Sequence, residues 1–219
     1  GDGRDDEGAV VRYQFVTRCW GEKVAARLQD AVATWAPDAI VMNSCLWDTT
    51  RYFDNEDESL ADYLKNLDKL TDFLKSSGYK GMFLWYTCFP VSPKVNAALF
   101  GPMAREKQVA QIGQLSTMIP IANHLAAAVV RARGWDAVDF WRLALRDFEQ
   151  RLDDGCHWSP KLHRRLTAQL ATFLEHRFTE EKEGASRGLV GEVYQRGSKV
   201  TNNNATSSSI ASDTGGRTS

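Results

Sequence analysis

The sequence lacks several features that would place it in a common functional class. Its 27 Lys and Arg residues nearly balance its 28 Asp and Glu residues, for a net charge of −1. A chain this close to neutral lacks the broad positive surface that holds nucleic acid and the basic cluster that holds an acidic membrane. No run approaches the roughly 20 consecutive apolar residues of a membrane span. We therefore expect neither nucleic acid nor a membrane as a partner.

Closely spaced cysteine pairs and a secretory leader are also absent. The four cysteines, Cys19, Cys45, Cys88 and Cys156, stand far apart beside apolar or aromatic residues, which is typical of reduced thiols in or near a core. Zinc ligands usually come in close pairs, so we expect no metal site from them. The first seven residues include four acidic ones, where a signal peptide would begin basic and continue apolar. These features predict a cytoplasmic protein with a disordered leader at residues 1–9.

Strand and helix patterns alternate between residues 10 and 178. Runs rich in β-branched and aromatic residues predict strands at residues 10–17, 38–44, 81–89 and 137–140. Apolar residues at helical spacing predict helices at residues 22–35, 59–76, 119–133, 141–151 and 160–178, and Pro120 is expected in the first turn of its helix. The alternation predicts an α/β fold with a parallel sheet and helices on both faces.

The composition changes after residue 178. Residues 201–219 are mostly Ser, Thr, Asn and Gly, with almost no large apolar side chains. Such a segment cannot offset the entropy of ordering. We therefore expect one domain at residues 10–178 and a disordered polar tail at residues 179–219.

Ligands of parallel sheets bind beyond the carboxyl ends of the strands, which directs attention to two loops. In one, Asp154 stands three residues ahead of His157, so its carboxylate can fold back onto the ring and leave the other ring nitrogen to act as a general base. The same spacing also suits a plain turn before a helix. In the other, Asn43 ends a strand, where its amide can donate to a developing oxyanion or simply cap the turn. For Asp48, Arg51 and Tyr52 we expect a surface ion pair.

Three segments together resemble the PC-esterase domain proteins, a branch of the GDSL/SGNH-like acyl esterases. They are FVTR at residues 15–18, NSCLWD followed by RY within residues 37–52, and DGCHW followed by HR within residues 154–164. The resemblance covers about residues 10–178. It implies a three-layer α/β/α SGNH-hydrolase (flavodoxin-like) fold and hydrolysis of a small-molecule ester without metal or organic cofactor. It also implies roles for Asn43 in the oxyanion hole, for His157 as the base and for Asp154 as its orienting acid.

One departure from the family pattern concerns the nucleophile. The family uses the serine of a Gly-Asp-Ser motif after the first strand, and the sequence contains no such motif. Gly1-Asp2-Gly3 has glycine in place of that serine and lies too close to residues 10–17. The resemblance thus implies an SGNH sheet that lacks its first strand. Two functions stay open, an acyl-ester hydrolase whose serine is absent from this chain and an inactive SGNH-fold binding or scaffold module.

Substitute nucleophiles and other ligand classes are less well supported. Ser44 and Cys45 follow Asn43, but a nucleophile needs a base within hydrogen-bond reach, and we expect both to be structural. No predicted strand is followed by the GxGxxG pattern of a dinucleotide-binding site. The sequence therefore favours the two functions given above over a nucleotide-binding function.

Overall fold

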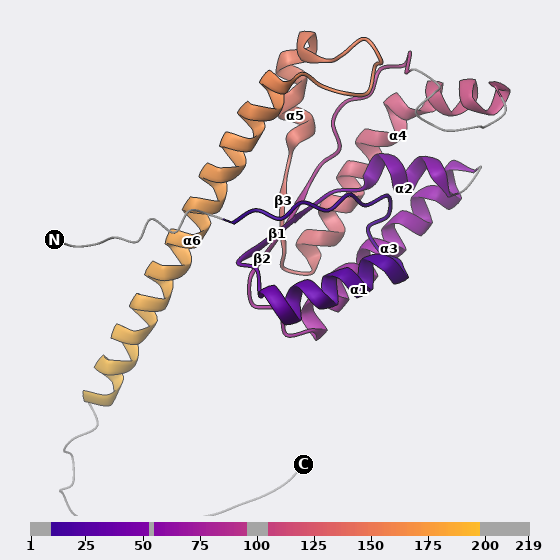
Figure 1. Ribbon diagram of the computed structural model, residues 1–219. Helices are drawn as coiled ribbons and strands as arrows, with labels where there is room; N and C mark the ends of the chain where they lie inside the picture. Colours follow the sequence, from indigo (N-terminus) through magenta and orange to yellow (C-terminus); the bar gives the residue numbers. More distant parts are fainter. Residues whose placement is uncertain (1–9, 53–54, 96–104, 198–219) are drawn as a thin grey trace, which may run out of the picture. The chain divides into compact units, whose positions relative to one another are not determined.

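The computed structural model describes residues 10–52, 55–95 and 105–197 (Figure 1). Its helices are α1 (Glu22–Asp30), continued by a π-helical turn (Ala31–Trp35), α2 (Cys45–Arg51), α3 (Glu56–Ser76), α4 (Arg105–Ala132), α5 (Phe140–Ala144), continued by a 3₁₀ helix (Leu145–Gln150), and α6 (Pro160–Gly197). Its strands are β1 (Ala39–Met42), β2 (Met82–Tyr86) and β3 (Asp136–Val138). The predicted alternation of strands and helices is therefore confirmed from β1 onward.

The three strands form one parallel sheet in the order β1-β2-β3. Ala39 pairs with Met82, and Leu84 pairs with Asp136. The predicted neighbours at residues 38–44 and 81–89 are thus parallel strands, as expected. Because β2 lies in the middle, its residues 82–85 are buried, whereas Ala39, Ile40 and Val41 at the β1 edge are only half-buried.

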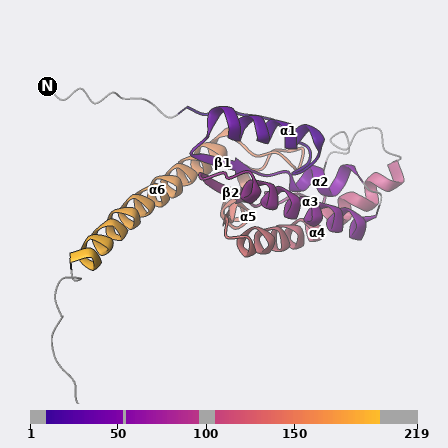
Figure 2. The same ribbon diagram turned by 90° about the horizontal axis from the view of Figure 1, so that it is seen from below.

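Side chains of β2 alternate between two helical layers, which confirms the three-layer α/β/α architecture. Phe83 and Trp85 belong to the core cluster, and the Trp85 ring lies 6.3 Å from the ring of Tyr63 on α3. On the opposite face, the Tyr86 ring lies 5.4 Å from Phe140 of α5. Helices α3 and α4 lie side by side in both views (Figures 1 and 2).

Helix α3 shows how local sequence and burial agree. Asn55 caps its start by accepting hydrogen bonds from the amides of Asp57 and Glu58. Its apolar residues recur at helical spacing and are fully buried, namely Tyr63, Leu67, Leu70 and Leu74. Gly78, at φ 74°, turns the chain after the helix in a conformation that favours glycine.

The predicted strand at residues 10–17 is wrong. These residues have no regular secondary structure, and Val10, Val11 and Tyr13 are 85%, 87% and 84% exposed. A strand needs a hydrogen-bonding neighbour, and the described residues offer none to this segment.

Two helices also differ from expectation. Residues 45–51, expected to be a loop, form α2. Helix α4 begins at Arg105, so Pro120 lies in its interior instead of its first turn. The lost backbone hydrogen bond is offset by a buried stripe of Leu115, Ile119, Ala122, Ala126 and Val130. By length and composition alone Leu115–Ala132 would suit a membrane span, and a buried core helix has the same composition.

The chain divides into two compact units, Gly1–Thr167 and Ala168–Ser219. In the second unit α6 continues past the expected end at residue 178 to Gly197. His176 and Arg177 both pair with Glu180, at the spacing that supports a helix. Residues 179–197 of the expected disordered tail at 179–219 are thus helical, and the rest of that tail lies outside the described residues, as does the expected leader at residues 1–9.

Gly81, just before β2, offers a test of the close approach between the two strand-forming segments. A Cβ atom there would lie 2.5 Å from the Pro37 carbonyl oxygen and 2.7 Å from that of Asp38. We expect Gly81→Ala to lower the free energy of unfolding by about 1–3 kcal/mol in urea denaturation, because backbone must shift. Gly21→Ala is the control, since a Cβ there meets nothing within 4 Å. Equal stability of the two variants would contradict the observed packing.

Candidate functional site

A cavity of about 420 Å³ lies at the carboxyl ends of β1 and β2. Its wall combines residues 12–16, the turn after β1, the end of β2 and the loop before α6. Asn43 and His157 both line it. The two residues therefore lie in the wall of one cavity at the strand ends.

The loop before α6 holds His157 against Asp154. The Oδ2 atom of Asp154 lies 2.7 Å from Nδ1 of the His157 ring. Its Oδ1 atom accepts hydrogen bonds from the backbone amides of Cys156 and His157, each at 2.8 Å. Because Nδ1 is engaged, the tautomer is set, and Nε2 has no hydrogen-bond partner among the described residues. The expected contact is present, and the role of His157 as a base stays a prediction.

Glycine at position 155 allows this loop to dock against the segment after β2. Gly155 has φ 78°, and its carbonyl accepts a hydrogen bond of 2.7 Å from the Ser92 amide. A Cβ atom at Gly155 would lie 2.8 Å from Cβ of Ser92 and 2.9 Å from the Lys94 carbonyl oxygen. Only glycine combines that backbone conformation with so close an approach. The loop is thus fixed to the sheet end rather than hanging in solvent.

Asp154 is electrostatically suited to orient a histidine. Partial burial tends to raise its pKa, but the hydrogen bonds from the Cys156 and His157 amides and from the His157 ring outweigh burial and lower the pKa to about 2. The preceding residue, Asp153, is exposed and makes no hydrogen bond or ion pair among the described residues. Asp154 is therefore the carboxylate of this loop that stays ionised beside the ring.

Asn43 lies between the ends of two strands. Its Nδ2 atom donates a hydrogen bond to the Tyr86 carbonyl oxygen at the end of β2. This contact fits the capping interpretation, and it also fixes the orientation of the amide. Nδ2 carries a second hydrogen, which leaves one donor for a ligand in the cavity. The oxyanion role of Asn43 stays a prediction.

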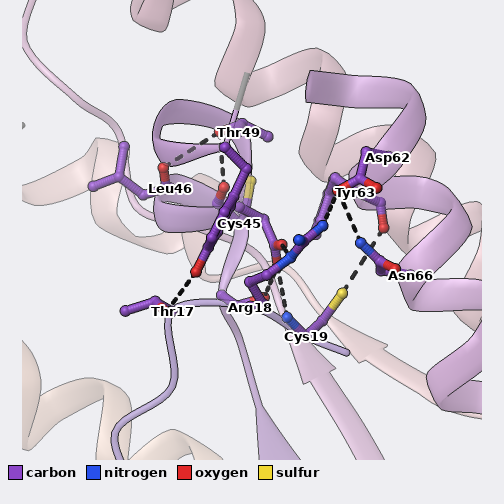
Figure 3. Close-up of polar contacts among 12 residues, drawn as sticks. Thr17, Arg18, Cys19, Cys45, Leu46, Thr49, Asp62, Tyr63 and Asn66 are labelled. Atoms are coloured by element: carbon purple, nitrogen blue, oxygen red, sulfur yellow. Dashed lines mark hydrogen bonds and ion pairs between the residues drawn. The ribbon is translucent and has the colours of Figure 1, made fainter. Parts of the chain in front are cut away.

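Asp48 belongs to a buried polar cluster. Figure 3 shows two members of this cluster, Arg18 and Cys19, which contact Asp62 and the Tyr63 carbonyl oxygen of α3. The Asp48 side chain is fully buried, and Oδ2 accepts hydrogen bonds of 2.6 Å from the Ser44 hydroxyl and from the Cys19 amide. Nε of Arg18 lies 3.5 Å from the other carboxylate oxygen, and the same guanidinium pairs with Asp62 of α3. Burial raises the pKa of Asp48, although these partners oppose the shift.

The expected surface ion pair of Asp48, Arg51 and Tyr52 is wrong. Asp48 points inward to Arg18, whereas the Arg51 guanidinium stacks over the Trp47 ring at 3.9 Å. Helix α2 explains the error, because it places Asp48 one turn after Ser44 on the buried side and Arg51 on the exposed side.

Neither substitute nucleophile is paired with a histidine among the described residues. Ser44 is 2% exposed, and its hydroxyl donates to Asp48. Cys45 is fully buried, and a hydrogen bond with Cys88 together with burial raises its pKa well above the ordinary value. Both environments fit a structural role.

The structure adds a second histidine to the cavity wall. His163, on the first turn of α6, has its ring 5.7 Å from that of Phe89, and burial and then the nearby His157 lower its pKa. His163 belongs to the HR pair of the family resemblance, which implied no role for it. The spacing of six residues between His157 and His163 could not have predicted this position, because the intervening turn and the start of α6 determine the direction of the His163 side chain.

No family model matches the chain. It is 33% identical over 163 residues to PC-esterase domain-containing protein 1B of Rattus norvegicus, covering 72% of this chain and 37% of that protein. It is 31% identical over 164 residues to the 1B protein of Homo sapiens, covering 74% and 36%. It is 25% identical over 163 residues to the 1A protein of Homo sapiens, covering 74% and 35%. The chain thus spans little more than a third of the length of the curated relatives it matches.

The low pKa of Asp154 predicts a pH-dependent contribution to stability. A carboxylate whose pKa falls from the ordinary value near 3.9 to about 2 on folding stabilises the fold above pH ~4 and loses that contribution between pH ~4 and ~2. Since the side chain is 31% exposed, we expect Asp154→Asn to cost about 1 kcal/mol at pH 7, with a difference that shrinks in this acid window. Urea denaturation at several pH values measures it. Asp153→Asn is the control, and an equal loss there would argue against the Asp154 contact.

Arg18 and Arg51 provide a matched pair for the Asp48 cluster. We expect Arg18→Ala to lower the free energy of unfolding by about 2–4 kcal/mol, because Asp48 is left buried without its cation. Arg51→Ala removes only an exposed contact with Trp47, and we expect a loss of about 0.5–1 kcal/mol. Denaturant unfolding measures the loss of unfolding free energy in both variants. A larger loss for Arg51→Ala than for Arg18→Ala would contradict the buried Asp48–Arg18 contact and favour a surface ion pair with Arg51.

Proposed function

Since the chain belongs to the family of PC-esterase domain-containing proteins, we propose that it carries the base half of an acyl-ester hydrolase site. The observation that supports this most is the ionised Asp154 held 2.7 Å from Nδ1 of His157, whose Nε2 lacks a partner among the described residues. His157 also shares its cavity with Asn43. A base, its orienting acid and an amide donor are three of the groups that acyl transfer requires.

The proposed chemistry follows the usual order of acyl transfer. Nε2 of His157 takes the proton of an attacking hydroxyl, and Asp154 stabilises the imidazolium that results. The second Nδ2 hydrogen of Asn43 donates to the oxygen that becomes negative. These steps involve no metal or organic cofactor, and the ligand is a small-molecule ester.

The attacking hydroxyl is not assigned to this chain. The sequence contains no Gly-Asp-Ser, and the Ser44 hydroxyl is engaged with Asp48. We therefore propose that these 219 residues alone do not hydrolyse esters at a rate that depends on His157. The same observations favour a second candidate, an SGNH-fold module that binds a ligand without turning it over.

Methanol, supplied as an external nucleophile, separates the two candidates. If His157 is a working base, it should promote attack of methanol on p-nitrophenyl butyrate more than attack of water, because methanol is the better nucleophile toward an ester and the apolar cavity retains it. We therefore expect His157→Ala to reduce methyl butyrate formation about tenfold or more. His176→Ala is the control, because His176 also faces a carboxylate, Glu180 at 3.6 Å, but lies in the second unit. Equal methanolysis by His157→Ala and the wild type would refute the base half and leave the binding module.

Ester hydrolysis in water and labelling by a fluorophosphonate test the missing nucleophile. We expect no label on the chain, and rates within about twofold for wild type, His157→Ala and Ser44→Ala with acetate and butyrate esters. A large loss in His157→Ala would show that a nucleophile is present. If Ser44→Ala lost as much hydrolytic activity as His157→Ala, Ser44 would be the nucleophile.

A further inference from the structure

We infer that the cavity binds an ester through an apolar group of about six to eight carbon atoms, and that acetyl is too small to fill it. This inference rests on the proposed function, because it names the class of ester that the site would hold. Four features of the cavity carry it: its size, the rings that line it, the lack of acidic groups and the fixed position of its outer wall.

The size of the cavity sets the first limit. Its 420 Å³ correspond to about fourteen water molecules at roughly 30 Å³ each, within the range of about 300–1,000 Å³ typical of sites for small organic ligands. An acetyl group replaces on the order of two of those waters. A group of about six to eight carbons, with its ester linkage and a small alcohol, occupies most of the volume.

The lining sets the second limit. Aromatic rings contribute from every part of the wall, namely Phe15, Trp47, Tyr86, Phe89 and Trp158. The Phe15 and Trp47 rings meet edge to face at 6.0 Å, and the Phe89 and Trp158 rings do so at 6.1 Å. Replacing water with hydrocarbon at such surfaces lowers the free energy and therefore favours binding of an apolar group.

Charge argues for a neutral ligand. Among the described residues that line the cavity there is no Asp or Glu. Its one arginine, Arg12, has its guanidinium stacked over Trp35 at 4.1 Å. The polar groups left to meet a ligand include Asn43 and His157, which suits a single ester group attached to an apolar body.

The outer wall is held in place next to the cavity. Phe15 lies two residues before Thr17, whose hydroxyl is 2.7 Å from that of Tyr52, and the Cys19 amide is bound to the buried Asp48. On the other side, Arg51 lies over Trp47. Because both rings of the Phe15–Trp47 pair are restrained, the cavity keeps its volume for a ligand.

A series of non-hydrolysable analogues tests the inference. The probes are the N-methyl amides of acetic, butyric, hexanoic, octanoic and benzoic acids, with binding followed by the NMR signals of the His157 ring. If methylene groups enter the cavity, affinity should rise about fourfold per methylene and level off between hexanoyl and octanoyl. The benzoyl arm distinguishes an aryl from an alkyl group, and either one binding far more tightly than acetyl supports the inference.

Two wall variants locate the apolar group. Phe15→Ala should weaken binding of the hexanoyl amide about fivefold and leave the acetyl amide within twofold, because only the longer group reaches the ring. Val11→Ala is the control, since Val11 is 87% exposed and does not line the cavity. Equal effects of the two variants would overturn the placement.

The outcomes separate this inference from the proposed function. Equal affinity along the series, or tightest binding of the acetyl amide, overturns the inference while the methanolysis result stands. Binding of none of the amides also overturns it, and methanolysis then decides independently whether His157 acts as a base.

Discussion

The arrangement of this domain depends on the contacts made by the fully buried carboxylate of Asp48. A charge without access to water must be paired and hydrogen-bonded, because the cost of an unsatisfied one is several kcal/mol. The partners of Asp48 come from separate parts of the chain: Oδ2 accepts hydrogen bonds from the Cys19 amide and the Ser44 hydroxyl, and Oδ1, which has no hydrogen bond, lies 3.5 Å from Nε of Arg18. Since Arg18 also pairs with Asp62, one carboxylate ties the segment before α1 to α2 and α3.

This constraint also shapes the candidate site. Ser44 is adjacent to Asn43, so holding its hydroxyl fixes the turn that presents the Asn43 amide at the end of β1. The Cys19 amide fixes the end of the segment whose residues 12–16 form the outer wall of the cavity. The same contact that organises the fold thereby argues against Ser44 as the nucleophile, because its hydroxyl already donates to a buried carboxylate.

Features that depend on neighbouring residues could be predicted from the sequence, and features that depend on distant partners could not. The stripe of α3, the buried strand β2 and the Asp154–His157 contact are each specified within one segment. Residues 10–17 have an equally good strand pattern, yet a pattern cannot supply the neighbouring strand that hydrogen bonding requires. The burial of Asp48 was missed for the same reason, since Cys19 and Arg18 lie about thirty residues before it in the chain.

The Asp154–His157 pair is local in sequence, but the site around it is not. Two amides from the same turn help to lower the pKa of Asp154 to about 2, so its negative charge is present at neutral pH. The turn itself is fixed by Gly155 against residues 92–95, which follow β2, and Asn43 is fixed by a carbonyl at the end of that strand. Strand β2 therefore sets the position of both the proposed base and the proposed oxyanion donor. A nucleophile that completes this site has to reach the cavity between them, whose wall beyond β1 is built by residues 12–16 and α2, while the rest is built by β2 and the start of α6.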